Sequence, residues 1–448
     1  MEHRSKSRVM DMTKGKPAQL LLEFSIPLFL GNLLQQFYNL ADTAIAGHML
    51  GDEALAQIGA TAALYSLITN FAFGMNNGLA LTVSRYFGAG KKEKMKQAVC
   101  WMFNLSAVFS LLLTAGFMAG RYGLMKFLQI PEETIPGAIS YLTVILMGIP
   151  LTMAYNLESG LLQAVGNSRT PLMFLLFSSL LNVVLDVVFM GPLNRGVRGA
   201  AEATVLAQGI SAVLGLFYIW SHYHELRFGR KQLAAGSRFV KGMLVTGLSM
   251  ALMSTIYNIG SVALQSSINA LGSVYIAAQV GGRRLAEFFY TPGLALGTSM
   301  ATYSSQNYGA GQTGRIKEGV RTAILLYGIW WVLSMAMTFL FAEDMIGMIT
   351  GSSTPEVISN AFLYLKISIP MVPPMAVLVI LRNALQGMER AFLPLFCSAL
   401  ELIGKIVFAV WLVPVWGYLA VCVCEPVTWV ICGAVIVIGV KKTGLELI

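Results

Sequence analysis

The chain has 448 residues, of which 56% are hydrophobic and only 12% are charged, and its formal net charge is +9. Soluble domains carry roughly 25% charged residues, so this composition excludes an ordinary soluble protein. A basic chain can bind nucleic acid, but the Lys and Arg residues here cluster in short polar breaks between long apolar runs. We therefore expect a membrane protein with lipid around it and no nucleic-acid partner.

Twelve apolar runs follow one another along the chain, and each is long enough to cross a bilayer core, which takes about 18 residues or more. Because backbone polar groups inside a bilayer must be satisfied within each segment, we expect every run to be a helix. The expected spans are roughly 18–46, 54–84, 97–119, 136–164, 169–192, 199–221, 240–270, 273–304, 319–341, 358–385, 392–414 and 416–440. The predicted fold class is an all-α integral membrane protein with 12 transmembrane helices in two pseudo-symmetric six-helix lobes.

The distribution of positive charge predicts the orientation of these spans. Most Lys and Arg residues lie at the two ends of the chain and in the breaks after the even-numbered spans. Arg121, Lys126, Arg195 and Arg198 lie in breaks on the opposite side. By the positive-inside rule we expect both termini in the cytoplasm and a multi-pass protein of the cell inner (plasma) membrane.

A repeat relates the two halves of the chain. The sequence RYFGAGKKEKMKQAV at 85–99 returns 221 residues later as QNYGAGQTGRIKEGV at 306–320. The longest polar break, the cytoplasmic linker 222–239, separates a predicted N-lobe, 1–221, from a predicted C-lobe, 240–448. Two related bundles of this kind are typical of secondary transporters, which rock about a site between their repeats.

The repeated Gly88-Ala-Gly90 and Gly309-Ala-Gly311 motifs lack the lysine and the spacing of a phosphate-binding loop. We expect them to form tight turns where helices approach closely. With no nucleotide-binding motif in the chain, transport is expected to use an ion gradient or to run downhill. The five cysteines and four histidines lack metal-ligand spacing. We therefore expect no metal centre and no cofactor other than a coupling ion, and the chain is not expected to be an enzyme.

Polar side chains form stripes on three spans of the N-lobe, where residues three or four apart share a helix face. The stripes are Gln35, Tyr38 and Asp42; Ser179, Asn182 and Asp186; and Thr204 with Gln208. Carboxylates inside membrane helices are costly and are functional candidates by default. Two acids brought close together would share a proton, so the stripes predict the wall of one ion-linked cavity. Asp42 and Asp186 also lie near span ends, where each could instead be hydrated and structural.

Several motifs resemble one family. The segment FSIPLFLGNLLQQFYNLADTAIAG at 24–47 is similar to the first span of multidrug and toxic compound extrusion (MATE) transporters. Segments 182–186, 196–204 and 306–311 resemble the family's fifth and sixth spans and its junction between spans 8 and 9. The resemblance implies an antiporter that exports structurally diverse organic, often cationic, compounds by alternating access, coupled to protons, sodium or both.

The resemblance also assigns roles to residues. It places the family's proton-linked network on Asp42, Asn182, Asp186 and Thr204, which could equally bind Na⁺, with Gln35, Tyr38 and Asn156 nearby. The substrate-cavity residues expected from the stripes and the resemblance are Gln35, Tyr38, Asn156, Glu158, Ser179 and Gln208. Pro27, early in the first span, is expected to act as a hinge or to impose a fixed bend.

The C-lobe departs from one branch of the family. Neither 244–270 nor 358–381 contains an acid, which argues against the cation site of the NorM-like branch and favours a prokaryotic DinF-like branch. Glu401 and Lys405 are four residues apart and are expected to neutralise each other. Glu287 is expected to pair with Arg283 or Arg284.

Two other functions remain open. One is a lipid-linked precursor flippase of the same superfamily, although such proteins usually have 14 spans and an Arg-rich cavity. The other is a membrane scaffold or channel without transport activity. The expected partners are small organic substrates (drugs, dyes and toxins) and membrane lipid, and the protein is expected to be a monomer.

Overall fold

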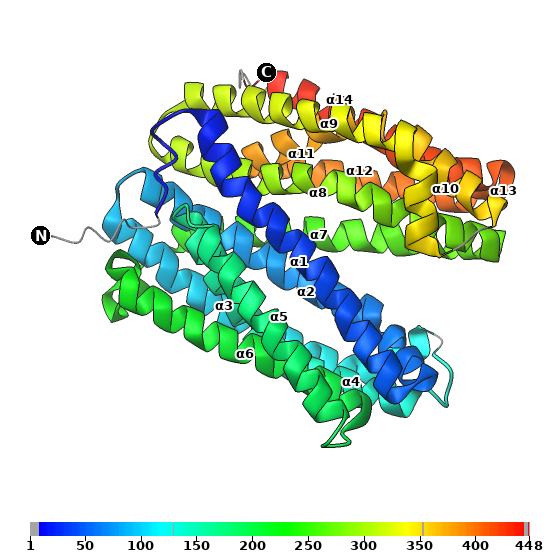
Figure 1. The fold of residues 1–448 in the computed structure, drawn as a ribbon. Helices are drawn as coiled ribbons and strands as arrows, with labels where there is room; N and C mark the ends of the chain where they lie inside the picture. Colours follow the sequence, from blue (N-terminus) through cyan, green and yellow to red (C-terminus); the bar gives the residue numbers. More distant parts are fainter. Residues whose placement is uncertain (1–8, 129, 352–353, 443–446, 448) are drawn as a thin grey trace, which may run out of the picture. The chain divides into compact units, whose positions relative to one another are not determined.

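The computed structural model describes residues 9–128, 130–351, 354–442 and 447, and within these residues it contains helices and no β-strand (Figure 1). Each of the twelve predicted spans coincides with one helix or with one interrupted helix. The first nine are α1 Pro17–Leu50, α2 Asp52–Gly88, α3 Lys92–Phe127, α4 Ile135–Ala164, α5 Arg169–Met190, α6 Gly196–His222, α7 Ser237–Leu271, α8 Ser273–Gly309 and α9 Thr313–Thr350.

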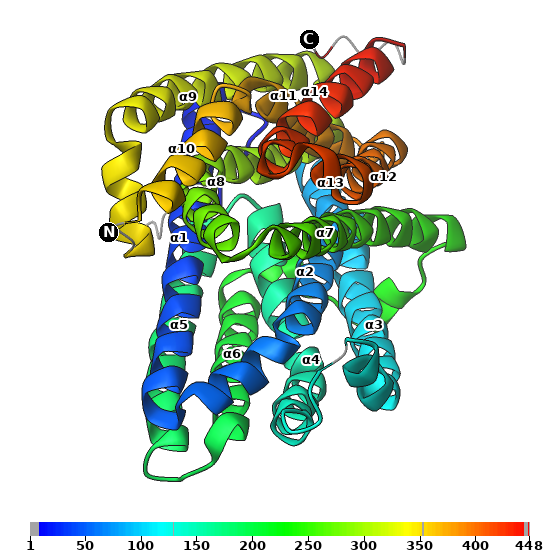
Figure 2. The same ribbon diagram turned by 90° about the vertical axis from the view of Figure 1, so that its right-hand side faces the viewer.

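The tenth and eleventh spans are interrupted. The tenth consists of α10 Pro355–Ser368 and α11 Val372–Gly387, which meet at an angle of 56° (Figure 2). The eleventh runs from α12 Phe392–Val407 through a π-helical turn, Phe408–Leu412, into α13 Val413–Trp416. Proline lies within the first two positions of α11, where its missing N–H costs nothing. In α13 the proline follows the π-helical turn directly and lacks an N–H inside a continuous helical run. The twelfth span is α14 Tyr418–Lys442.

The spans are apolar enough to cross a membrane with one exception. Among the described residues, ten helices pass by length and hydropathy, and the bent pair passes as an eleventh span. The exception is α8, which carries Arg283, Arg284 and Glu287. These charges set it apart as a polar membrane helix, and the prediction of twelve helices in an all-α membrane protein is confirmed.

The described chain divides into two compact units. One contains residues up to Asp11 and Leu30–Ala251, and the other contains Met12–Phe29 and Leu252–Ile448. Relative to the predicted lobes, the start of α1 groups with the later spans, and the linker with the start of α7 groups with the earlier ones. Both helices therefore contribute to both units. We call the first the N-unit and the second the C-unit.

Within the N-unit, α4 packs against α2, α3 and α6, and α5 packs against α6 (Figure 1). The first part of α7 crosses α2 where both helices carry glycine. A Cβ on Gly78 would lie 2.7 Å from the Cα of Gly247, and one on Gly74 would lie 2.6 Å from the carbonyl oxygen of Met250. Small residues allow membrane helices to approach this closely. The close packing of α2 against the first part of α7 therefore depends on these glycines.

The linker is folded against the N-unit. It forms two short 3₁₀ turns, His224–Leu226 and Arg230–Leu233. Lys92, at the start of α3, binds Glu225 at 2.6 Å, and Gln232 donates to Glu93 at 3.3 Å. The linker therefore has defined contacts along its length.

Within the C-unit, the segment before α1 is held by polar side chains of the repeated motif. Gln306 accepts from the backbone N–H of Met12 at 2.8 Å, and Asn307 donates to the carbonyl of Met12 at 3.0 Å. Arg315 donates to the carbonyl of Gly15 at 2.9 Å. These contacts give the Gln-Asn pair of the motif a structural role that the sequence pattern did not reveal.

The two Gly-Ala-Gly motifs form matching turns. Gly90 and Gly311 have φ angles of +66° and +74°, which favour glycine. The N–H groups of Lys91 and Gln312 bond back to the carbonyls of Tyr86 and Asn307 at 3.0 and 2.8 Å. The prediction of tight turns is confirmed. The close helix approach expected there is wrong for Gly90 and Gly311, because a Cβ on either would meet nothing within 4 Å.

Candidate functional site

The centre of the candidate site is a pair of acids in the N-unit. Asp42 lies on α1 and Asp186 on α5, and their carboxyl groups are within hydrogen-bonding range of each other. Asp186 is fully buried. One oxygen of each carboxyl group, Oδ1 in both residues, is buried without a hydrogen-bond donor. Buried polar atoms in proteins are almost always paired, so these two oxygens lack donors that they would be expected to have.

Asn182 connects the pair to α6. With its amide oriented to satisfy both neighbours, its nitrogen donates to Oδ2 of Asp186 at 2.8 Å and its oxygen accepts from the backbone N–H of Thr204 at 3.1 Å. The hydroxyl of Thr204 donates to the carbonyl of Ala200 at 3.1 Å and is also hydrogen-bonded to the Tyr38 hydroxyl. Asp42, Asn182, Asp186 and Thr204 thus form one network across α1, α5 and α6.

An apolar cluster lies one helical turn beyond the acid pair on these helices. Ala46 follows Asp42 by four residues, and Met190 follows Asp186 by four, which puts each on the same helix face as its acid. Ala200, four residues before Thr204, joins them, and all three are buried. This cluster lies between the acid pair and the ends of α1 and α5.

A small cavity adjoins the network on the other side. Its volume is about 20 Å³, roughly the space of one water molecule. Polar groups from the predicted stripes line it, together with Leu175, Ala207, Ser178 and Tyr155. The stripe residues in its wall are Gln35, Tyr38, Ser179, Asn182, Thr204 and Gln208. Most of the stripe residues therefore share one cavity wall, whereas the two acids of the stripes, Asp42 and Asp186, do not line it.

Two of the proposed cavity residues lie elsewhere. Asn156 turns its amide back to the carbonyl of Thr152 on its own helix, at 2.8 Å. Glu158 is buried against Gly215 of α6, and its Oε2 has no hydrogen-bond partner. Neither residue lines the cavity next to the acid pair.

The structure adds residues that the stripes did not include. Tyr65 of α2 is hydrogen-bonded to Gln208, which also accepts from Thr152 of α4 at 2.7 Å. Tyr141 of α4 lies close enough to interact electrostatically with both acids. Each is a polar aromatic or hydroxyl in an apolar span. Tyr65 and Thr152 had a signal in the sequence, because Thr61 and Asn156 lie four residues from them, whereas Tyr141 has no polar residue at helical spacing.

A comparison with known families identifies the fold. The MatE family model matches residues 27–188 and again 249–411, once in each half of the repeat. The chain belongs to the MatE family. Members of this family are transporters, so the prediction of a MATE transporter rather than an enzyme is confirmed. The assignment to a DinF-like branch stays a prediction.

Individual MatE relatives agree with this assignment. The chain is 28% identical over 363 residues to the "Probable multidrug resistance protein YpnP" of Bacillus subtilis, covering 80% of each chain. It is 24% identical over 352 residues to the "Probable multidrug resistance protein NorM" of Thermotoga maritima, covering 78% of this chain and 75% of the relative. A solved outward-facing multidrug resistance MATE family transporter shares 22% identity, with a TM-score of 0.90 and coverage of 100% and 99% of the two chains.

The C-unit contains further buried charges. The predicted pairing of Glu401 with Lys405 is wrong there. Glu401 does not neutralise Lys405; it accepts from Arg382 of α11 at 2.8 Å, whereas Lys405 contacts Glu425 of α14 at 3.5 Å. Cations on neighbouring helices offer better geometry than the residue one turn away. Glu287 pairs with Arg283 at 3.0 Å, one of the two partners expected for it.

Proposed function

We propose that this MatE transporter exports structurally diverse organic compounds, often cationic, by antiport with an inward flow of ions through alternating access. The family and the names of its curated relatives support the substrate class. The main support for coupling to an ion is the pair of facing carboxyl groups of Asp42 and Asp186. One oxygen of each acid lacks a hydrogen-bond donor.

A single proton between the two acids supplies the missing donor. Protonated on one side, the pair becomes a donor and an acceptor, and the orphaned oxygens are satisfied. A substrate cation near the pair provides the other way to balance the charge. Proton and substrate thus compete for one charge-balancing role, and this competition makes exchange obligatory.

Sodium is the second candidate for the coupling ion. The network presents two carboxylates, the amide oxygen of Asn182 and the hydroxyl of Thr204 around one region. Hard cations prefer oxygen ligands of these types. The same residues therefore serve either ion, and a transport assay separates the two.

Export requires the site to widen. The cavity beside the acids has room for about one water molecule and none for an organic compound. Pro27 removes one backbone hydrogen bond from α1, and the division of α1 between the two units falls just after it, between Phe29 and Leu30. We propose that α1 bends there, carrying Tyr38 and Asp42 with it.

The protein is proposed to act as a monomer in the plasma membrane with both termini in the cytoplasm. The first helix then runs outward, which puts Asp42, in the last three turns of α1, in the outer half of the membrane. Asp186, one turn before the end of α5, comes to the same level. Protons from outside then have only the apolar cluster around Ala46 and Met190 to pass before they reach the pair.

Purified protein in dye-loaded vesicles tests this function. We expect dye efflux when an inward proton gradient is imposed, and little efflux under a sodium gradient at equal pH on both sides. Efflux under sodium alone would replace the proton with sodium in the proposal. No efflux under either gradient would favour a scaffold, a channel or a flippase for lipid-linked precursors.

A further inference from the structure

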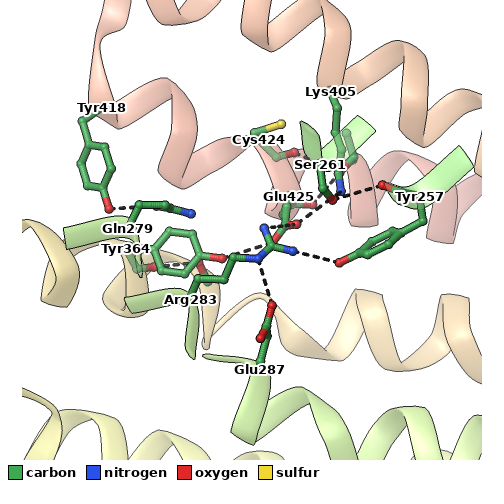
Figure 3. A network of polar contacts seen from close by, with 12 residues as sticks. Tyr257, Ser261, Gln279, Arg283, Glu287, Tyr364, Lys405, Tyr418, Cys424 and Glu425 are labelled. Atoms are coloured by element: carbon green, nitrogen blue, oxygen red, sulfur yellow. Dashed lines mark hydrogen bonds and ion pairs between the residues drawn. The ribbon is translucent and has the colours of Figure 1, made fainter. Parts of the chain in front are cut away.

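The C-unit contains a buried charge cluster that the N-unit network does not explain. Side chains of α7, α8, α10, α12 and α14 meet in this cluster around Glu425 (Figure 3). Arg283 of α8 and Lys405 of α12 contact its Oε1 at 3.4 and 3.5 Å, and the hydroxyl of Tyr364 of α10 donates to its Oε2 at 3.2 Å. Tyr257 and Ser261 of α7 complete the cluster.

The two cations are held from several sides. Lys405 donates to Ser261 at 3.0 Å, and its ammonium lies 4.0 Å from the centre of the Tyr257 ring. Arg283 donates to the Tyr257 hydroxyl at 3.2 Å and to Glu287 at 3.0 Å (Figure 3). The cations are therefore fixed in position before any ligand arrives, which lowers the entropic cost of binding.

The four charged side chains of the cluster differ in how deeply they are buried. The side chains of Lys405 and Glu425 are 4% and 5% exposed, and that of Arg283 is 24% exposed. Glu287, at 41%, is the most exposed of the four, and its carboxylate contacts Arg283. The inner part of the cluster thus carries two positive charges and one negative charge, and an exposed acid balances the remainder.

The repeat places this cluster at the position of the N-unit network. Gly196 and Gly417 both have a φ of +57° and lie at the starts of α6 and α14. Thr204 and Glu425 each follow their glycine by eight residues. Glu425 is therefore the repeat counterpart of Thr204, a member of the proposed coupling network.

A second correspondence runs through α5 and α12. Pro171 and Pro394, each near the start of its helix, are repeat counterparts, and Asn182 and Lys405 each follow by eleven residues. The two units thus place chemistry of opposite sign on corresponding helices. Two acids and neutral polar groups occupy the N-unit site, whereas an ammonium and a guanidinium dominate the C-unit site.

Helix stability alone gives no reason to keep these charges. Buried ion pairs are often no more stabilising than apolar residues of similar size, and ionisable residues in membrane helices mark functional sites by default. The π-helical turn Phe408–Leu412 begins three residues after Lys405, and such turns are frequent at functional sites.

We propose that the Arg283–Lys405–Glu425 cluster binds an anionic group, a carboxylate or phosphate, of a transported compound, with Arg283 as the recognising residue and Glu287 as an exchangeable counter-ion. This inference rests on the proposed export function. The incoming anion takes the place of Glu287 on the Nε edge of the guanidinium, whose planar fork suits both anions. Glu425 stays in place because Arg283, Lys405 and Tyr364 all hold it. The substrates would then include zwitterions and organic acids as well as cations.

The test uses two fluorescent rhodamines that share one ring system. One carries a free carboxylate and the other carries its methyl ester, so the pair differs in the anionic group alone. Binding to the purified full-length protein is measured by fluorescence polarisation, which does not require transport. Acetate and inorganic phosphate serve as competitors for the carboxylate dye.

We expect Arg283→Gln to weaken binding of the carboxylate dye at least about tenfold and to change binding of the ester less than about twofold. Glu287→Gln should strengthen binding of the carboxylate dye, because it removes the competing acid. Arg284→Gln, an exposed neighbour on the same helix, is the matched control and should change neither. A purely structural cluster would instead give equal losses for both dyes in Arg283→Gln and no gain in Glu287→Gln, and that result would overturn the proposal.

Two further arms separate the remaining outcomes. In phosphatidylcholine nanodiscs, competition from added phosphatidylglycerol would mean that a lipid headgroup occupies the cluster, which would overturn its assignment to a transported compound. Selective dye binding without efflux under any gradient would contradict the export function and retain the anion site. Efflux of both dyes with no selective effect of Arg283→Gln would retain export and reject the anion site.

Discussion

The carboxyl groups of Asp42 and Asp186 come from the first and fifth helices, yet they lie within hydrogen-bonding range of each other. Asn182 occupies one oxygen of Asp186, and one oxygen of each acid remains without a donor. Two like charges at this range repel strongly where water is excluded. This arrangement is the basis of our proposal that the network takes up a positive ion.

Replacing either acid of this pair should abolish coupling. We expect Asp42→Asn and Asp186→Asn each to slow gradient-driven dye efflux at least about tenfold, because an amide neither takes up nor releases a proton near neutral pH. The double variant should be little worse than either single variant, since residues that act as a unit are not additive. Vesicle efflux rates at a fixed inward proton gradient provide the measurement.

Asp344→Asn is the matched control for this experiment. It makes the same chemical change at an exposed position of α9, and efflux should stay at the rate of the unaltered protein. Wild-type efflux in both Asp42→Asn and Asp186→Asn would remove the acids from the mechanism.

The sequence predicted the polar wall of the site because helical spacing is a local property. Residues three or four apart share a face in any helix, so Gln35, Tyr38 and Asp42 lie on one face of α1 as the sequence predicts. Pairing between helices is not local. Lys405 has an acid one turn away on its own helix and still contacts Glu425, because five helices converge at that point and the nearest sequence neighbour is not the nearest charge.

Composition could not predict the boundary between the two units, for a similar reason. The polar break at 222–239 marks where the chain leaves the membrane region, but which unit a helix joins depends on its contacts. Met12–Phe29 groups with the C-unit because Gln306, Asn307 and Ser299 bind its backbone. In the sequence these residues are ordinary polar groups in a long helix. No periodic pattern connects them to Met12–Phe29, almost 300 positions away.

Loosening this clamp should expose the segment before α1. In Asn307→Ala the carbonyl of Met12 loses one donor and Arg315 loses the 3.1 Å contact of its Nε with the Asn307 side chain. We expect trypsin to cut after Lys14 several times faster, because proteolysis follows local opening. Mass spectrometry of timed digests gives the rate. Gln312→Ala, an exposed change in the adjacent turn, should leave cutting unchanged, and equal rates in both variants would contradict the clamp.

The buried pair of Arg382 and Glu401 allows a direct stability test. Glu401→Leu removes the partner at 2.8 Å and leaves a buried guanidinium uncompensated, so we expect a loss of about 3–5 kcal/mol. Adding Arg382→Met removes the orphaned charge and should recover most of that loss. Thermal unfolding of the purified protein measures both variants. If the double variant were less stable than Glu401→Leu, Arg382 would have another buried partner of comparable strength.

Glu158 and Gly215 provide a test of packing between α4 and α6. A Cβ on Gly215 would collide with the Glu158 carboxylate, which is buried and has an oxygen without a donor. We expect Gly215→Ala to destabilise the protein by about 1–3 kcal/mol, the usual cost of overpacking. In a Glu158→Ala background the same change should cost little, because the space is then free. This non-additivity is the signature of a direct contact.

Gly116→Ala is the control for the helix itself. Gly116 lies within α3, and a Cβ there meets nothing within 4 Å. Alanine favours a helix over glycine by roughly 0.5–1 kcal/mol, so this variant should be slightly more stable than the unaltered protein. If Gly215→Ala were equally stabilising, the Glu158 side chain would have to turn away from α6 at little cost. Its carboxylate would then be mobile within the N-unit, and Glu158 would be able to reach other polar groups of the unit.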